Sequence, residues 1–256
     1  MRNVLNIIGT GFVFLFICRV VLAEDAAFTN SLARADLAQK DGNIQEAVKI
    51  YHADEQAEGS NAVYLCVLSR RYCDLTYLTN SAAVQKDLVA HALTCAQQAV
   101  QDNPTNATAH SSLAVCYAKS CNYTDIKTKL AYSRIFKSEA EKAIALDPRQ
   151  DVAWYLLGRW NYAMANVGLL SRAYVKMVYG GLPQASLEQA VQNFKKACEL
   201  APNSILNHAG LAMAYGAAGE KKLEIAELEK CCALKPHSPE DKEAFQDAAK
   251  KLAALQ

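Results

Sequence analysis

The chain has little net charge, few prolines and none of the familiar catalytic motifs. Its 27 lysines and arginines nearly balance its 26 aspartates and glutamates, which gives a formal net charge of +1. Nucleic-acid-binding proteins normally carry a basic stripe, so this balance argues against that class of partner. The sequence contains no H-E-x-x-H, P-loop, dinucleotide-binding glycine motif or G-x-S-x-G. These absences predict a protein that is not an enzyme and uses no cofactor.

Histidines and cysteines are present without the spacing of a metal site or a disulfide framework. The five histidines are dispersed along the chain, so we expect no metal ligands among them. Cys116 and Cys121 lie about 7.5 Å apart along one predicted helix, whereas bridged Cα atoms usually lie within about 6.8 Å. Cys66 and Cys73 are further apart still. We therefore predict that the cysteines are mostly reduced, and that Cys231 serves as a small buried apolar side chain.

Apolar residues make up 52% of the chain and charged residues 21%, which is enough to form a packed core. Four of the six prolines mark a repeat, because each follows a small side chain by five residues. A small side chain lets two helices approach closely, and a proline shortly afterwards ends a helix. The four pairs are Ala99 with Pro104, Ala143 with Pro148, Ala197 with Pro202, and Cys231 with Pro236. The pattern predicts an array of helical repeats.

The spacing of these prolines indicates the kind of repeat. From Pro202 to Pro236 the interval is 34 residues, which resembles the two-helix tetratricopeptide repeat. The two preceding intervals are 44 and 54 residues, so they contain inserts of about 10 and about 20 residues. We predict an all-α, right-handed, tetratricopeptide-like helical solenoid with elongated repeats over residues 24–256. Residues from about 239 to 255 are expected to form a capping helix with a polar outer face.

One repeat carries the strongest signature. Trp154, Leu157 and Gly158 match the W-x-x-L-G opening of a tetratricopeptide repeat. We expect both tryptophans to be buried and Gly158 to lie at a close crossing of two helices, so that the signature is architectural. The complete predicted signature is Trp154, Leu157, Gly158, Arg159, Trp160, Ala190, Phe194, Ala197 and Pro202.

The same repeat also resembles a particular family. The LLGRW run ends at Trp160, a long amphipathic insert follows, and a G-L-P-Q-A-S turn begins at Gly181. Together these features resemble the core of the regulator of microtubule dynamics family of tetratricopeptide proteins. The resemblance extends with lower specificity from about Ala33 to Leu252. It implies a helical repeat fold, and it does not by itself assign the family's activity to this chain.

The N-terminal segment, residues 1–23, is typical of a signal peptide. Arg2 precedes a mostly apolar stretch that ends at Cys18, and small residues lead to a cleavage site between Ala23 and Glu24. This pattern predicts an exported protein, periplasmic or secreted, for which tubulin is not an available partner. The alternative is an uncleaved membrane anchor, although the apolar stretch is shorter than the roughly 20 residues that span a bilayer.

The predicted function follows from the fold class. We expect a noncatalytic scaffold whose concave face binds a protein or peptide. The alternative is a membrane-tethered module that binds a lipid or another apolar ligand in a groove, because the insert is apolar on more than one face. The residues of that possible groove are Val167, Leu170, Tyr174 and Met177. We favour packing of the insert against neighbouring helices.

Overall fold

The computed structural model describes residues 26–57, 61–181 and 183–255. In these ranges every regular element is a helix, so the predicted all-α class is confirmed. The chain divides into two compact units, Met1–Gly59 and Ser60–Gln256, where the sequence predicts one continuous repeat domain. The predicted signal peptide, with Ala23 and Glu24, lies outside the described residues.

The first unit contains one helical hairpin. A helix over residues 26–40 is followed by α2 (Ile44–Ala57), and Gly42 makes the turn with a φ of 75° that favours glycine. Ala47 and Tyr51 of α2 are fully buried. The amide of Gln39 donates a hydrogen bond of 2.5 Å to the Tyr51 hydroxyl, which joins the two helices.

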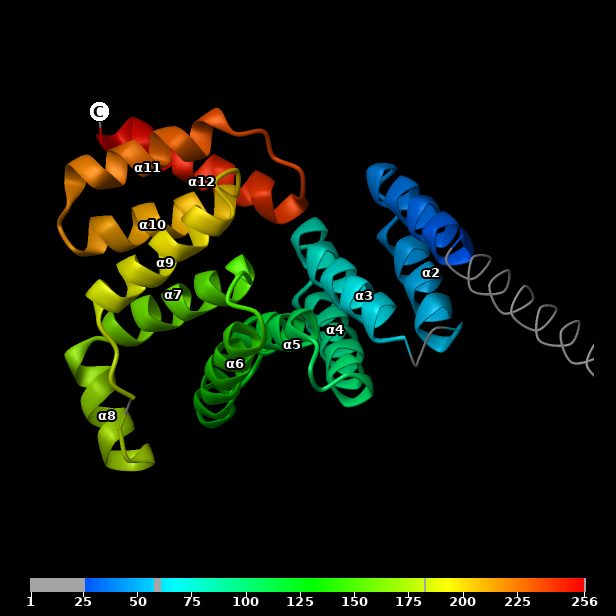
Figure 1. Ribbon diagram of the computed structural model, residues 1–256, viewed down its shortest axis with the longest axis horizontal. Helices are drawn as coiled ribbons and strands as arrows, with labels where there is room; N and C mark the ends of the chain where they lie inside the picture. The colour runs from blue at the N-terminus through cyan, green and yellow to red at the C-terminus, as the bar shows by residue number, and fades with distance from the viewer. Residues whose placement is uncertain (1–25, 58–60, 182, 256) are drawn as a thin grey trace, which may run out of the picture. The chain divides into compact units, whose positions relative to one another are not determined.

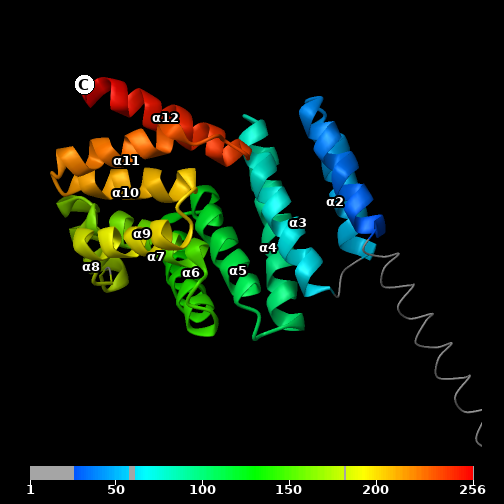
Figure 2. The same ribbon diagram turned by 45° about the horizontal axis from the view of Figure 1, so that its top comes forward.

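The second unit is an array of helical hairpins (Figures 1 and 2). Its hairpins are α3 (Ala62–Leu75) with α4 (Ala82–Asp102), α5 (Ala107–Ser120) with α6 (Ile126–Leu146), α7 (Asp151–Ala165) with α9 (Leu187–Leu200), and α10 (Ile205–Ala217) with α11 (Lys221–Ala233). Short 3-10 helices η1 (Thr76–Leu78) and η2 (Cys121–Tyr123) follow α3 and α5. Helix α8 (Leu169–Tyr179) lies between α7 and α9 in the chain, and α12 (Pro239–Leu255) ends the unit.

Local sequence defines where these helices begin. A side-chain oxygen before the first turn accepts a backbone N–H and so replaces a hydrogen bond that the helix cannot supply. This N-cap occurs at Asn61, Ser81, Asn106, Asp125, Ser186 and Ser204. Near the helix ends, the small residues of the repeat, Ala99, Ala143, Ala197 and Cys231, are all fully buried.

The extra residues of the long repeats lie in two places. Helices α4 and α6 have 21 residues each, whereas α9 and α11 have 14 and 13. The 44-residue interval is therefore long because of η2 and a lengthened α6. The additional residues of the 54-residue interval form α8.

The signature residues divide between the core and the surface. Trp160, Leu157, Ala190, Phe194 and Ala197 are buried in the packed interior. Gly158 also lies at a close crossing, because a Cβ atom at this position would be 2.7 Å from the Phe194 ring. Arg159 and Pro202 are exposed.

The expected burial of Trp154 is wrong, because its side chain is only half-buried. The indole Nε1 donates a hydrogen bond of 2.9 Å to the carbonyl oxygen of Pro148, in the turn before α7. This bond keeps the ring at the start of the helix instead of in the core.

The helices on the inner side of the second unit contact one another in a closed ring. Neighbours along the array, α3 with α5, α5 with α7, α7 with α10, and α10 with α12, are in contact. Helix α12 in turn contacts η1 and α3, and Figure 2 shows its N-terminal end beside α3. The helix at residues 239–255 therefore does more than cap the last repeat, because it returns to the first helix of the unit and closes the inner face.

Candidate functional site

Two adjoining cavities lie on the inner face of the second unit. Their volumes are about 720 and 560 Å³. We call the two cavities and the wall between them the inner groove. The side chains that line both cavities are Tyr77, Tyr155, Arg159, Leu206 and Glu240. These residues come from η1, α7, α10 and α12, so the wall exists only because the ring of helices is closed.

A hydrogen-bonded group ties α12 to the rest of the wall. The Tyr77 hydroxyl donates a bond of 2.6 Å to Glu240 Oε1. Lys119 Nζ donates to the Tyr77 hydroxyl at 2.8 Å and lies 3.8 Å from the same Glu240 oxygen. Burial and the neighbouring Glu240 raise the pKa of Tyr77, so its hydroxyl keeps the proton that it donates. The C-terminal helix is therefore held on η1 by a charge-assisted contact.

Arg159 supplies a constant positive charge to the wall. Its Nη1 donates a hydrogen bond of 3.1 Å to the Tyr155 hydroxyl. The interaction with Tyr155 raises the pKa of Arg159, although burial opposes this. Arg159 lines both cavities, so its charge can act on a ligand in either one.

The two cavities differ in the charges that line them. The larger one is mainly acidic, with Glu224, Glu240, Glu243 and Asp247 against Arg159 and Lys251. The smaller one is mainly basic, with Arg70, Lys119, Lys129, Arg159 and Lys235 against Asp151, Glu240 and Asp241. Such an arrangement favours a ligand that carries a basic group at one end and an acidic group at the other.

The insert residues predicted to form an apolar groove lie elsewhere. Leu170 is 89% exposed, Met177 is 79% exposed and Tyr174 is 46% exposed, whereas Val167 is half-buried. None of the four lines the inner groove. The favoured expectation that the insert packs on neighbouring helices is wrong for Leu170 and Met177, because α8 is oriented by its other face, at Arg172 and Val175.

A third cavity of about 500 Å³ contains a perturbed carboxyl group. Asp74 is 7% exposed, and its Oδ1 lies 3.8 Å from Arg70 Nε. Burial raises the pKa of Asp74 to about 6, and the charge of Arg70 only partly offsets this. Between pH 4 and 6 the folded chain therefore binds more protons at this site than the unfolded chain, so stability falls as the pH rises through that window.

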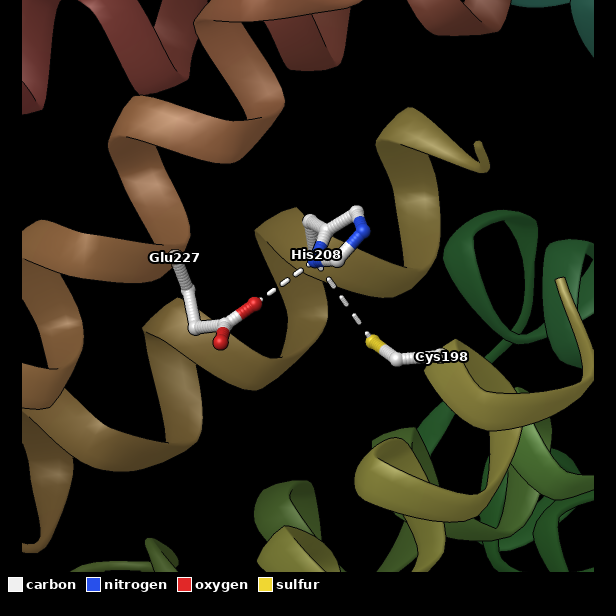
Figure 3. A group of neighbouring side chains, drawn as sticks. All are labelled: Cys198, His208 and Glu227. Carbon is white, nitrogen blue, oxygen red and sulfur yellow. Dashed lines mark hydrogen bonds and ion pairs between the residues drawn. The ribbon is translucent and has the colours of Figure 1, made fainter. Parts of the chain in front are cut away.

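One cluster of potential metal ligands is present in the described part of the chain (Figure 3). Cys198 Sγ, His208 Nδ1 and a Glu227 oxygen all lie within 4.8 Å of one another. They come from α9, α10 and α11. This group was not predicted from the sequence, because its three residues come from three different helices.

The geometry of the cluster argues for a structural role. His208 Nε2 donates to the Pro202 carbonyl at 2.8 Å, and Nδ1 lies 2.6 Å from Glu227 Oε2. A carbonyl only accepts, so Nε2 carries a proton, and Nδ1 is occupied by its contact with the Glu227 carboxylate. Burial and Glu227 raise the pKa of Cys198 to about 12, which keeps its thiol protonated.

The same arrangement occurs two repeats earlier, in the hairpin of α5 and α6. His110 Nδ1 lies 2.5 Å from Glu139 Oε2, and Nε2 lies 2.9 Å from the Pro104 carbonyl oxygen. Each glutamate also accepts a bond of 2.7 Å from the lysine three residues later, Lys142 or Lys230. Although burial opposes it, these hydrogen bonds lower the pKa of Glu139. The recurrence identifies the His–Glu pair as part of the repeat architecture.

A positional signal for these pairs is present in the sequence. His110, Trp154 and His208 each stand six residues after a repeat proline, and each ring nitrogen bonds to that proline's carbonyl oxygen. In the repeats that contain His110 and His208, a glutamate stands four residues before the small repeat residue. The repeat that contains Trp154 has Asn193 at that position. Aligning the repeats on their prolines would therefore have found the pairs.

The chain is similar in sequence to proteins that are named as regulators of microtubule dynamics. The chain is 29% identical over 237 residues to Regulator of microtubule dynamics protein 1 of Mus musculus, covering 92% of this chain and 77% of the relative. It is 30% identical over 238 residues to the protein of the same name in Pongo abelii, covering 92% and 75%. The similarity thus extends over nearly the whole chain.

These relatives overturn the prediction that the chain is exported. They are named as regulators of microtubule dynamics, and microtubules are polymers of the cell interior. A periplasmic or secreted location is therefore wrong. The prediction of export was based only on an arginine followed by a short apolar segment. This pattern did not determine the compartment of the protein.

No helix among residues 26–57, 61–181 and 183–255 combines the length and apolar character needed to cross a bilayer. None of the eight cysteines in these ranges forms a disulfide.

Comparison with solved structures supports the fold. The chain resembles a thermophilic tetratricopeptide repeat protein in Thermus thermophilus with a TM-score of 0.61 and 17% sequence identity, covering 87% of this chain and 99% of that one. The predicted tetratricopeptide-like helical solenoid is therefore confirmed. At this level of identity the likeness concerns the fold alone.

The family comparison agrees with the residues that carried the resemblance. The model described as Regulator of microtubule dynamics protein 1-3 matches residues 31–256. This range includes both halves of the signature, the LLGRW run and the second helix of the same repeat, as well as the insert between them. The chain therefore belongs to the regulator of microtubule dynamics family.

Proposed function

We propose that the second unit is a noncatalytic scaffold that binds a segment of a partner protein in the inner groove. The observation that carries this proposal is the closed ring of inner helices, which encloses two adjoining cavities with opposite predominant charge. Helical repeat proteins commonly present their concave surface to a partner. Arg159 supports the proposal because it is a charged side chain that lines the groove and forms no ion pair with the residues that the structure describes.

The chemistry of the groove describes the segment that it would accept. The larger cavity suits a basic side chain, and the smaller cavity suits an acidic one. Tyr77 and Tyr155 in the wall offer ring surface for the apolar part of the segment. An extended peptide with both charges is therefore a better fit than a uniformly basic or acidic one.

The family name indicates where to look for the partner. Tubulin was excluded only because export was expected, and that expectation is wrong. We therefore infer that the partner is tubulin or a protein bound to microtubules, and that binding changes how microtubules grow or shorten.

The test is cosedimentation of the full chain with stabilised microtubules, together with measurement of microtubule growth and shortening rates. Replacing Arg159 with alanine should weaken binding about tenfold, since a hydrogen bond to a charged group contributes roughly that much. Its thermal unfolding should be unchanged, because Arg159 is exposed. A Lys222→Ala change on α11, which also removes one exposed positive charge, is the matched control and should have no effect.

Two results would contradict the proposal. If Arg159→Ala binds as strongly as the unmodified chain, the inner groove is not the binding surface. If Lys222→Ala weakens binding to the same extent, the interaction depends on overall charge rather than on the groove.

A further inference from the structure

Helix α8 turns an apolar face towards solvent. Leu169 is 85% exposed, Leu170 is 89% exposed and Met177 is 79% exposed. Residues seven apart, such as Leu170 and Met177, lie on the same face of a helix, and exposed Ala173 lies between them. Val175, on the opposite side of the helix, is 3% exposed. The most apolar face of α8 is therefore the one that does not pack.

This orientation is fixed by specific contacts. Arg172 Nη2 donates a hydrogen bond of 2.8 Å to the Met164 carbonyl oxygen, at the C-terminal end of α7. An arginine at this position satisfies a carbonyl that the helix leaves without an internal partner. Arg172 and the buried Val175 thus hold one face of α8, and the leucines project from the other. Figures 1 and 2 show α8 at the edge of the unit, next to α7.

The charges on α8 are of one sign. The helix contains Arg172 and Lys176 but no aspartate or glutamate. Lys176 is exposed at the border of the apolar face. A helix with an apolar face, bordering lysine and tyrosine side chains, and no acidic group is typical of helices that lie in the surface of an anionic bilayer.

The size of the helix also favours this partner. With 11 residues it is about 16 Å long, far too short to cross about 30 Å of hydrocarbon but long enough to lie in the membrane surface. A stable protein interface usually needs about 800 Å² from each partner, more than one face of such a short helix supplies. A bilayer has no such minimum, because each apolar side chain that enters it adds to binding.

We propose that α8 docks the protein on an anionic lipid surface, with Leu169, Leu170 and Met177 in the acyl boundary and Lys176 among the headgroups. This contact uses a surface distinct from the inner groove. A partner could therefore be bound in the groove while α8 is on the membrane, and the proposal does not depend on the proposed function.

Flotation with phosphatidylcholine vesicles, with and without phosphatidylserine, tests the proposal on the full chain. Leu170→Glu should reduce vesicle binding about ten- to hundredfold, because it places a charge where the leucine side chain would enter the bilayer. Lys176→Gln should reduce binding about fivefold, and only when phosphatidylserine is present. The matched control is Val63→Glu, which changes another exposed apolar residue, 61% exposed on α3, and should bind as the unmodified chain does.

A second measurement locates the contact even if residues 1–25 also bind vesicles. In the Met177→Trp variant, vesicles with brominated acyl chains should quench more fluorescence than in the unmodified chain, whose tryptophans are Trp154 and Trp160. Equal quenching in the two proteins would overturn the proposal. It would also be overturned if sedimentation velocity shows that Leu170→Glu converts an oligomer into a monomer, since the face would then bind a second copy of the chain.

Discussion

Replacing Gly158 with alanine would place a methyl group where the ring of Phe194 already lies. A Cβ atom at Gly158 on α7 would be 2.7 Å from Phe194 Cδ1, and one at Gly210 on α10 would be 2.5 Å from Cε1, whereas ordinary contacts begin near 3.4 Å. The ring is fully buried and packs edge-to-face against Tyr155, with centroids 5.7 Å apart. It therefore has glycines on two sides and an aromatic ring nearby.

The magnitude follows from two opposing effects. Inserting a methyl group into a packed core costs about 1–3 kcal/mol, because side chains and backbone must shift. Alanine regains up to about 1 kcal/mol through its higher helix propensity. Since the neighbouring atoms belong to a rigid buried ring, we expect Gly158→Ala to lower the free energy of unfolding by about 1–2 kcal/mol.

Urea unfolding measures the effect, and a double-mutant cycle assigns it to the ring. Phe194→Leu removes the atoms that the new methyl group would meet, so Gly158→Ala should cost less in the Phe194→Leu background. Gly168→Ala is the control. A Cβ atom there meets nothing within 4 Å, and as an N-cap change it should cost only about 0.5 kcal/mol. The reasoning is refuted if Gly158→Ala is as stable as the unmodified chain, or if the two changes are additive.

Three further predictions concern stability. Trp160→Ala should cost about 3–5 kcal/mol by leaving a cavity, whereas half-buried Trp154→Ala should cost only about 1–2 kcal/mol; thermal unfolding compares them. Glu227→Gln should lower the free energy of unfolding by about 1–3 kcal/mol, because it weakens the buried pair with His208. Cys198→Val should be nearly neutral, because valine stands at the corresponding position beside the other His–Glu pair; urea unfolding measures both changes. Asp74→Asn should remove a stability loss of about 3 kcal/mol that the unmodified chain shows between pH 4 and 6, and equal pH slopes in the two proteins would contradict this.

Features that depend on neighbouring residues were predictable from the sequence. The small residue and the proline that end each repeat, such as Ala143 and Pro148, recur at a fixed spacing because helix packing and helix termination are local requirements. The LLGRW run and the turn before α9 indicated the family for the same reason. Gly158 was predicted at a close crossing, although its counterpart Gly210 was missed because it lies outside that motif.

The candidate site could not be predicted in the same way. Tyr77 and Glu240 are 163 residues apart, and no local pattern indicates that they meet. The orientation of α8 was also hidden, because an apolar helix can pack inward or face solvent with the same sequence. The sequence by itself therefore determined the helices, their repeat and the family. Only the tertiary structure decided that α12 returns to α3, that the closed ring has a charged groove, and that Leu170 and Met177 face outward. These features depend on the angles at which successive helices pack, and those angles accumulate over the whole array.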